Sequence, residues 1–377
     1  MRLIFASAGA YGHMVPLVPL AVAARSAGHD VAFATDDRFH PALSEAGLDP
    51  ISAGITVRAA IGTAARQAPP GASSRAAQQA FGSVLPRRTI ADLEPVLADR
   101  KPDLLVYEVL NPGAGIAASR AGIPAICHGI GRVSEGATWK AMCTTWIATA
   151  EEFGIDVPAD NPQFFGNPYL DICPPSMQVP KILALANRSP LRPVAWNERA
   201  ELPLFVMERN KNRPLVYVTL GTALSSAAVL REVIDGLSRL PVDVIVSTGR
   251  MGSSDIGDVP AHVVVEDWVP QGDLLPYIDL VVSHGGSGTT LGTLAHGLPH
   301  LVIPQGADQF SNAQAVSDAG LGRRVLPADL TPQAVCEQAR ALLDDEATLG
   351  RAEEVAREIA GMPSPQETIE RLAGMAA

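Results

Sequence analysis

Basic residues, cysteines and long apolar runs are all scarce in this sequence of 377 residues. The 29 Lys and Arg residues are outnumbered by 40 Asp and Glu residues, which gives a net charge of −11. A nucleic-acid backbone needs a basic surface, so this balance excludes a general nucleic-acid binder, although a few backbone amides can still bind one nucleotide. No stretch approaches the ~18 uninterrupted apolar residues of a membrane-spanning helix, so we expect no stable membrane insertion.

The scarcity of cysteine argues against a zinc site and against a disulfide framework. The four cysteines are scattered, with no C-x-x-C pair and no paired spacing to histidine: Cys127, Cys143, Cys173 and Cys336. At the N-terminus, Arg2 and the mostly apolar residues 3–10 look like a signal peptide, but Gly12 and Pro16 break the run and a helical pattern follows at once. We therefore expect a protein of the reducing cytoplasm.

The patterning that is present predicts a folded α/β protein. Hydrophobic residues make up 47% of the chain and charged residues only 18%, and a chain of this length usually forms two domains. Short apolar runs alternate with helical patterns in two successive series, which predicts two doubly wound, Rossmann-like parallel-sheet domains facing a cleft. We expect an N-terminal domain over 1–205, a C-terminal domain over 206–362, and a last helix over 363–377 that crosses back to the N-terminal domain.

Two segments depart from the regular pattern, and we expect loop-rich structure at 55–83 and 130–180. Residues 57–83 are rich in Ala, Gly, Ser, Gln and Pro, which indicates a loop or a loosely packed helix pair. This part is either a surface insertion or a lid over a substrate. Residues 160–203 hold many prolines and little periodicity, so they are the candidate interdomain linker.

The strongest chemical signal is the run His284-Gly285-Gly286-Ser287-Gly288-Thr289-Thr290, which lies between a predicted strand and a predicted helix. Small residues let the backbone approach an anion, and the amides of a first helical turn point at it. The run is neither a Walker A loop, since no Gly-Lys-Ser/Thr follows, nor a dinucleotide fingerprint, since its last glycine is misplaced. A glycine turn with Ser287 or Thr289 as the helix cap is the simpler alternative.

The residues on either side of this loop fit a nucleotide sugar. Trp268 offers an aromatic wall for a base, whereas Asp308 and Gln309 begin a predicted helix and can hydrogen-bond sugar hydroxyls. Taken alone, Trp268 is more typical of a core residue and Asp308 of a helix cap. Their arrangement around one glycine-rich loop is what favours a binding site.

The order Trp268, Gln271, His284-Gly285-Gly286, Asp308-Gln309 resembles the donor signature of GT-B glycosyltransferases. The N-terminal run Gly9-Ala10-Tyr11-Gly12-His13-Met14-Val15-Pro16 resembles the first-strand loop of the same family. The resemblance covers essentially the whole chain and is strongest to actinobacterial antibiotic glycosyltransferases of the calicheamicin (enediyne), aromatic polyketide and macrolide types. Further stretches are most similar to the calicheamicin glycosyltransferases, at 5–7, 128–132, 166–168 and 220–222.

This resemblance implies an enzyme that inverts the configuration at C1 of the sugar and uses no metal cofactor. It implies transfer of a (deoxy)sugar from a dTDP-sugar to a hydroxyl of a small natural-product aglycone of enediyne, polyketide or macrolide type, in antibiotic biosynthesis. Preorganised amides and hydroxyls of the glycine-rich loop would stabilise the charge on the leaving diphosphate. The implied donor-binding residues are Thr222, Trp268, Val269, Gln271, His284, Gly286, Ser287, Gly288, Thr289, Asp308 and Gln309.

The resemblance also implies a general base. His13 lies on the loop after the first strand, and the ordinary imidazole pKa near ~6.5 suits proton transfer at neutral pH. The family commonly carries an Asp after the strand corresponding to 104–107, and this sequence has Glu108 there. Glu has one more methylene, which leaves the geometry of a His13–Glu108 pair open, and Asn111 is the fallback partner.

One departure from the family pattern bears on the donor. Related enzymes that use uridine sugars often have a Glu late in the phosphate-loop helix, where it grips both ribose hydroxyls, and this chain has Gly292 at the matching place. Glycine has no side chain to bind a 2′-hydroxyl, so Gly292 favours a thymidine donor. The alternative is that Gly292 serves only close packing.

Other functions on the same fold remain alternatives. They are a UDP-sugar-using transferase, an isomerase like UDP-N-acetylglucosamine 2-epimerase, a non-catalytic nucleotide-sugar-binding partner of another transferase, and a membrane-associated transferase with a lipid acceptor. An epimerase needs a cluster of acidic and basic groups, and the sequence offers little beyond His13 and Glu108. The sugar, the aglycone, the glycosylated atom type, homodimerisation and the need for an auxiliary protein are not determined by the sequence.

Overall fold

The computed structural model describes residues 1–67, 76–158, 162–198, 200–221, 226–249 and 251–376. The chain divides into two compact units. The first comprises Met1–Cys173, Gln178–Arg192 and Pro363–Ala377, and the second comprises Pro174–Met177 and Pro193–Met362. The expected boundary at 205/206 therefore falls about a dozen residues too late, because the chain from Pro193 onward already packs with the second unit.

The described part of the first unit contains a parallel sheet of seven strands in the order β3-β2-β1-β4-β5-β6-β7. The strand order reverses between β1 and β4, which is where ligands bind in doubly wound sheets. The strands are β1 (Arg2–Ala6), β2 (Asp30–Thr35), β3 (Asp49–Ser52), β4 (Leu104–Glu108), β5 (Ala125–His128), β6 (Tyr169–Asp171) and β7 (Arg188–Pro190).

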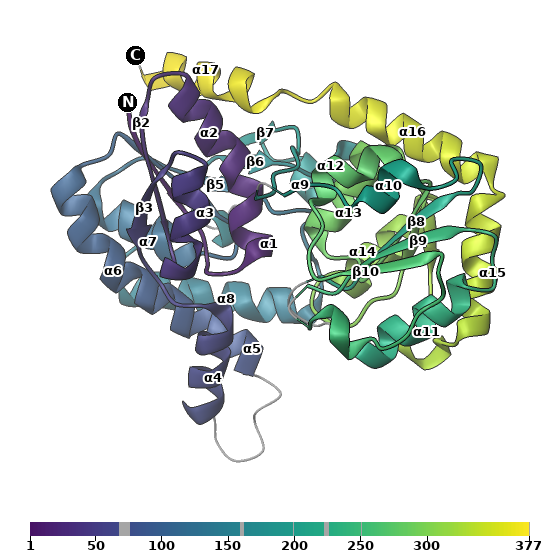
Figure 1. Cartoon of the computed structure of the whole chain (residues 1–377). Coiled ribbons are helices and arrows are strands. Elements are labelled where there is room, and N and C mark those ends of the chain that lie inside the picture. Colours follow the sequence, from purple (N-terminus) through teal and green to yellow (C-terminus); the bar gives the residue numbers. More distant parts are fainter. Residues whose placement is uncertain (68–75, 159–161, 199, 222–225, 250, 377) are drawn as a thin grey trace. The chain divides into compact units, whose positions relative to one another are not determined.

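Helices cover both faces of this sheet, because its central strands are apolar and buried on both sides. The C-terminal helix α17 packs against α2 within the same unit (Figure 1). The helices are α1 (Tyr11–Met14), α2 (Val18–Ser26), α3 (His40–Glu45), α4 (Val57–Gln67), α5 (Ala76–Gln79), the π-helix η4 (Ala80–Val84), α6 (Leu85–Arg100), α7 (Pro112–Ala121), α8 (Ala137–Glu152), α9 (Pro180–Leu183) and α17 (Pro365–Ala376).

The proline-rich stretch 160–203 is not simply a linker, as the sequence suggested. It contributes β6 and β7 to the sheet of the first unit. Both strands are only three residues long, and β7 ends in Pro190 at the sheet edge, where its missing N–H removes no ladder bond. Strands of only three residues carry too little periodicity to be recognised from the sequence.

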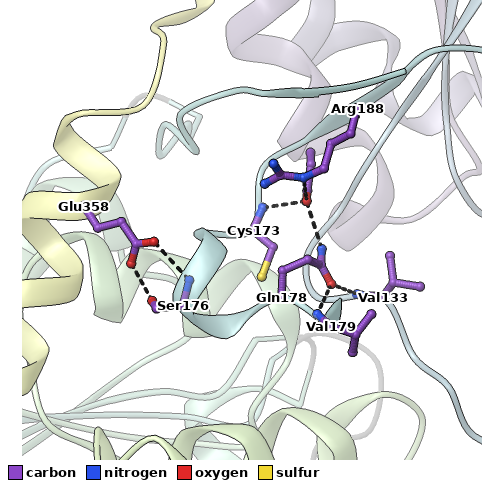
Figure 2. Close-up of polar contacts among 8 residues, drawn as sticks. Val133, Cys173, Ser176, Gln178, Val179, Arg188 and Glu358 are labelled. Atoms are coloured by element: carbon purple, nitrogen blue, oxygen red, sulfur yellow. Dashed lines mark hydrogen bonds and ion pairs between the residues drawn. The ribbon is translucent and has the colours of Figure 1, made fainter. Parts of the chain in front are cut away.

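A buried charge holds these two strands together. The Asp171 carboxylate accepts hydrogen bonds from the Cys173 amide (3.0 Å), from the Gln178 side chain (3.0 Å) and from Nε of Arg188 (2.7 Å). Figure 2 labels these three donors. Burial raises the pKa of Asp171, and the Arg188 contact opposes that effect. Gln178 also accepts from the Val133 amide at 3.2 Å, so the network ties several loops to the end of β6.

The expected irregular region at 57–83 is a packed helix pair where it is described. Helix α4 packs against α5 and η4 around a small core of Ala60, Ala64, Ala76, Ala80 and Leu85. Residues 68–75 lie outside the described part of the chain. The small alanine side chains let the helices approach closely.

The described part of the second unit contains a parallel sheet of six strands in the order β10-β9-β8-β11-β12-β13, and its strand order reverses between β8 and β11. The strands are β8 (Leu215–Thr219), β9 (Asp243–Ser247), β10 (Val263–Glu266), β11 (Leu280–Ser283), β12 (His300–Val302) and β13 (Gly322–Arg324). The helices are α10 (Leu204–Glu208), α11 (Ala227–Leu237), α12 (Gln271–Leu274), α13 (Ser287–Ala295), α14 (Gln309–Asp318), α15 (Pro332–Leu343) and α16 (Glu346–Ala360).

Each unit has its own apolar core. The core of the first unit includes the buried aromatic residues Trp146, Phe164 and Phe165. In the second unit, the segment that contains Ser176 is held to α16, because Glu358 accepts from the Ser176 amide at 3.0 Å (Figure 2). Within the described residues, no helix combines the length and the apolar character that a membrane span requires.

Candidate active site

His13 lies beyond the carboxyl end of β1, in the single-turn helix α1, and Glu108 is the last residue of β4. These are the two strands at which the order of the first sheet reverses. The fold therefore brings together two residues that are 95 positions apart in the sequence. Nδ1 of His13 lies 3.0 Å from Oε1 of Glu108. The extra methylene of Glu thus still allows a direct contact.

The surroundings of Glu108 fix the position of its carboxylate. The side chain is completely buried, and it accepts further hydrogen bonds from the amides of Ala8 (3.2 Å) and Leu110 (2.6 Å). These donors offset the cost of burying the group. Because an ionised carboxylate only accepts hydrogen bonds, we assign the ring proton of His13 to Nδ1, and Nε2 is then the basic nitrogen.

Asn111, the fallback partner, has a different position. Its backbone N–H donates to the backbone oxygen of Glu108 at 2.8 Å, and the residue stands at the N-cap of α7 with no side-chain cap bond. The contact to Nδ1 of His13 comes from Glu108. Phe81, which sequence reasoning did not single out, stacks on the imidazole of His13 with ring centroids 5.6 Å apart.

In the second unit, the glycine-rich loop follows β11, one of the two strands at which that sheet reverses. Gly286 is the N-cap of α13 and makes no side-chain cap bond. The expectation that Ser287 or Thr289 caps this helix is therefore wrong, because both residues already lie inside it. Without a side-chain cap, the first turn keeps amides that can bind an anion.

His284 packs between two glycines. A Cβ added at Gly221 would lie 2.6 Å from Nε2 of His284, and one added at Gly286 would collide with the same atom. Glycine at both positions is thus required for the imidazole to fit between the loops after β8 and β11. Burial lowers the pKa of His284, and the nearby Asp308 carboxylate opposes that effect, so the ring is neutral at pH 7.

A polar cluster joins the loop to the start of α14. Oδ2 of Asp308 accepts from the Ser287 hydroxyl at 2.8 Å and from the Asn312 side chain at 3.0 Å. Asn312 also donates to the backbone oxygen of Gly285 at 2.8 Å. Asp308 stands at the N-cap of α14 without a side-chain cap bond, so its carboxylate is used to hold the loop instead.

Thr289, in the first turn of α13, contacts Gln271 at the start of α12. The Thr289 hydroxyl donates to the Gln271 side-chain oxygen at 3.2 Å. Gly292, one turn further along, faces the same group, since a Cβ there would lie 3.1 Å from Nε2 of Gln271 and 3.1 Å from the Leu275 side chain. Gly292 therefore lies beside a residue of the donor signature.

The remaining predicted donor residues divide into three groups. Trp268 is 42% exposed, and Gly288 is exposed in the first turn of α13. The side chain of Val269 is buried in a core cluster, and that of Gln309 is used to accept from the amides of Gln305 (2.7 Å) and Gly306 (3.0 Å). Thr222 lies outside the described residues.

A buried histidine, His300, supports the glycine-rich loop through Ser283. Sequence reasoning did not identify it. Nε2 of His300 lies 2.7 Å from the Ser283 hydroxyl, which in turn accepts from the Gly285 amide at 3.0 Å. Burial lowers the pKa of His300 to about 3, so the ring is a neutral acceptor for the hydroxyl. Among the described residues, no group of three or more His, Cys, Asp or Glu side chains is placed to hold a metal ion.

Comparison with known proteins connects this geometry to characterised enzymes. Residues 231–375 match the family described as the C-terminal domain of erythromycin biosynthesis protein CIII-like proteins. The chain is 34% identical to elloramycin glycosyltransferase of Streptomyces olivaceus. The alignment is 401 positions long with its gaps and covers 99% of this chain and 97% of that protein.

Two solved structures illustrate the likeness of fold. A glycosyltransferase of Streptomyces sp. SF2575, solved in complex with thymidine diphosphate, has a TM-score of 0.81 and 26% identity over 99% of both chains. The calicheamicin glycosyltransferase CalG4 has a TM-score of 0.83 and 19% identity, with 99% of this chain and 98% of that chain covered.

Proposed function

Because this chain belongs to the actinobacterial antibiotic glycosyltransferases, enzymes of the GT-B fold, we propose that it is an inverting transferase with a dTDP-sugar donor. The acceptor in this proposal is a hydroxyl of a small aglycone of enediyne, polyketide or macrolide type. Membership in a transferase family decides against the epimerase and non-catalytic alternatives raised by the sequence.

The His13–Glu108 pair carries the proposal. It lies at the strand-order reversal of the first sheet, with 3.0 Å between Nδ1 and Oε1. A buried carboxylate at this distance fixes the tautomer of the imidazole and stabilises the imidazolium that forms when Nε2 takes a proton. An acceptor hydroxyl placed at Nε2 is then activated by a general base.

In the proposed reaction, the sugar passes from the diphosphate to the acceptor oxygen in one displacement. The acceptor oxygen forms a bond to C1 of the sugar as its proton passes to Nε2 of His13. The bond from C1 to the diphosphate oxygen breaks on the opposite face, and the electron pair leaves with the diphosphate. The proton later returns from the imidazolium to solvent or to the leaving group.

The leaving diphosphate gains negative charge, and the start of α13 suits that charge. The Gly286 cap leaves the first-turn amides for an anion, and the helix dipole adds partial positive charge at the same end. We therefore propose that turnover needs no divalent metal. The check is turnover after exhaustive chelation, and loss of activity that Mg²⁺ or Mn²⁺ restores would contradict this part.

Two observations support thymidine over uridine in the donor. Gly292 faces Gln271 and offers no side chain to a 2′-hydroxyl. The structurally similar glycosyltransferase of Streptomyces sp. SF2575 was solved with thymidine diphosphate. We further propose that the first unit holds the aglycone, since it contains His13, and that the second binds the nucleotide sugar.

The experiment that tests the base compares three proteins with one donor and one probe acceptor. Turnover of thymidine diphosphate glucose is followed with 4-methylumbelliferone, a planar phenol, for wild type, His13→Ala and Glu108→Gln. We expect His13→Ala to lower kcat by about 10²–10⁴-fold, because general-base catalysis is lost. We expect a smaller loss for Glu108→Gln, because Glu108 orients the imidazole and does not itself take the proton.

The affinity for thymidine diphosphate is the control, since neither residue lies in the second unit and both variants should bind it like wild type. Wild-type kcat in His13→Ala would refute the assignment of the base.

A further inference from the structure

The imidazole of His13 is held from a second direction, by a ring stacked on its face. The rings of Phe81 and His13 have centroids 5.6 Å apart and an interplanar angle of 22°. Glu108 contacts the same imidazole at its edge, through Nδ1. A hydrogen bond at one nitrogen still allows the ring to swing about that contact, whereas a stacked ring on its face opposes this rotation.

The backbone around Phe81 forms a π-helix, which ends next to a proline. Phe81 belongs to η4, a π-helix over Ala80–Val84 in which the Leu85 amide donates to the Ala80 oxygen. In the same i→i+5 pattern, the Phe81 oxygen would accept from residue 86, but Pro86 has no N–H. The sequence thus leaves the Phe81 carbonyl without its main-chain donor at the entry to α6.

Trp146 supplies the missing donor. Its indole Nε1 donates to the Phe81 oxygen at 2.9 Å, and its side chain is completely buried in the core of the first unit. Gly82 lets the π-helix approach α8, because a Cβ there would lie 3.0 Å from the Thr145 side chain. Phe81 is therefore anchored through its backbone by a rigid core residue on α8. Short π-helical turns of this kind are frequent at functional sites.

We propose that Phe81 is a positioning residue for the general base. This proposal rests on the proposed function, in which His13 takes the acceptor proton. Glu108 fixes the imidazole in its plane, and Phe81 fixes the orientation of that plane, so that Nε2 keeps one direction toward the acceptor oxygen. A misplacement of about 1 Å in a catalytic group can cost on the order of 10²-fold in rate, so this restraint affects turnover and not donor affinity.

A double-mutant cycle tests the proposal with the donor and phenol probe named above. We expect Phe81→Leu to lower kcat roughly tenfold with an unchanged Kd for thymidine diphosphate, and Phe81→Tyr, which keeps a flat ring, to restore most of the rate. In the His13→Ala background, Phe81→Leu should have no further effect, because the group it positions is gone.

Phe153→Leu is the matched control. Phe153 is also half-buried and packs on the core of the first unit, but its ring contacts Arg120. It should leave kcat near wild type. Equal losses from Phe81→Leu in both backgrounds would overturn the proposal and assign Phe81 a purely structural role. Wild-type kcat in His13→Ala would instead refute the proposed base, so the two failures are distinguishable.

NMR of the protein without substrate tests the proposal independently of the acceptor. In histidine-labelled protein, the His13 ring signals can be assigned through their absence in His13→Ala. The stacked Phe81 ring should displace these signals by its ring current, and Phe81→Leu should move them while those of His300 in the second unit stay unchanged. Unmoved His13 signals in Phe81→Leu would overturn the proposal.

Discussion

At the scale of single residues, the histidines of this chain differ in the groups around them. His13 has a buried carboxylate at one nitrogen, which orients the ring. His128 and His300 are completely buried, and the contacts of their rings among the described residues are to the Gly129 backbone oxygen and the Ser283 hydroxyl. Burial lowers the pKa of His128 to about 4 and that of His300 to about 3. Sequence position alone does not separate these roles.

These buried rings predict a pH dependence of stability. The unfolded chain binds a proton at each ring below about pH 6.5, whereas the folded chain does not until the pH reaches the lowered pKa. The stabilisation is therefore present above about pH 6.5 and is lost as the pH falls toward 4 for His128 and toward 3 for His300. At pH 5.5, urea unfolding should take up about one proton less in His128→Gln than in wild type. Proton uptake in weakly buffered solution measures this, and equal uptake by both proteins would contradict the account.

Gly292 predicts the nucleotide preference. Wild type should bind thymidine diphosphate about 1–3 kcal/mol more tightly than uridine diphosphate, and Gly292→Glu should narrow or reverse that difference. The new side chain must displace the Gln271 amide or Leu275 by a few tenths of an ångström, because its Cβ would lie 3.1 Å from each. Gly292→Ala is the control, since it adds the same Cβ without a carboxylate. Titration calorimetry decides, and a uridine preference in wild type would refute the thymidine assignment.

At the scale of elements, the sequence predicts what is long and periodic. The apolar runs at β1, β4, β8 and β11 carry both strand-order reversals, and with them the places of His13 and of the glycine-rich loop. The strands β3, β6, β7 and β13 have only three or four residues each and were missed. Their stability comes from tertiary contacts that leave no local pattern.

The π-helix η4 was missed for a different reason. The residues that accompany it are a proline at 86, a glycine at 82 and a tryptophan 65 residues away from Phe81. None of these residues indicates a π-turn until the fold brings them together. The sequence therefore identified residues that match motifs of the family, such as His13, Glu108 and the glycine-rich loop. It did not identify Phe81 and His300, which support them from other elements.

We predict that breaking two ion pairs of similar length has different costs in unfolding free energy, because one of them joins β6 and β7 in a buried position. Arg188 and Asp171 lie 2.7 Å apart and are nearly fully buried, whereas Arg87 and Glu152 lie 2.6 Å apart and are exposed. Arg188→Met leaves a buried carboxylate without its charge partner and should cost about 3–5 kcal/mol. Arg87→Met should cost about 0–1 kcal/mol, because solvent screens the exposed pair. Urea unfolding of both variants measures the difference, and equal costs would contradict a structural role for the Asp171 network.

At the scale of the whole molecule, the two units share one architecture. Each is a doubly wound parallel sheet. The strand-order reversal lies at His13 and Glu108 in the first unit and at the glycine-rich loop in the second. The chemistry at the two places differs, since the first has a histidine and a carboxylate and the second has a helix start with small residues and hydroxyls. Such a difference suits a reaction in which one unit activates the acceptor and the other binds the donor.

This division of roles is the central claim, and a crystal structure of the full chain with thymidine diphosphate tests it most directly. We predict the diphosphate at the first turn of α13, within hydrogen-bond distance of the amides of Gly286 to Thr289, with the base against Trp268 and the deoxyribose beside Gly292. A nucleotide bound at the carboxyl ends of β1 and β4 beside His13, with the start of α13 left without a ligand, would contradict it.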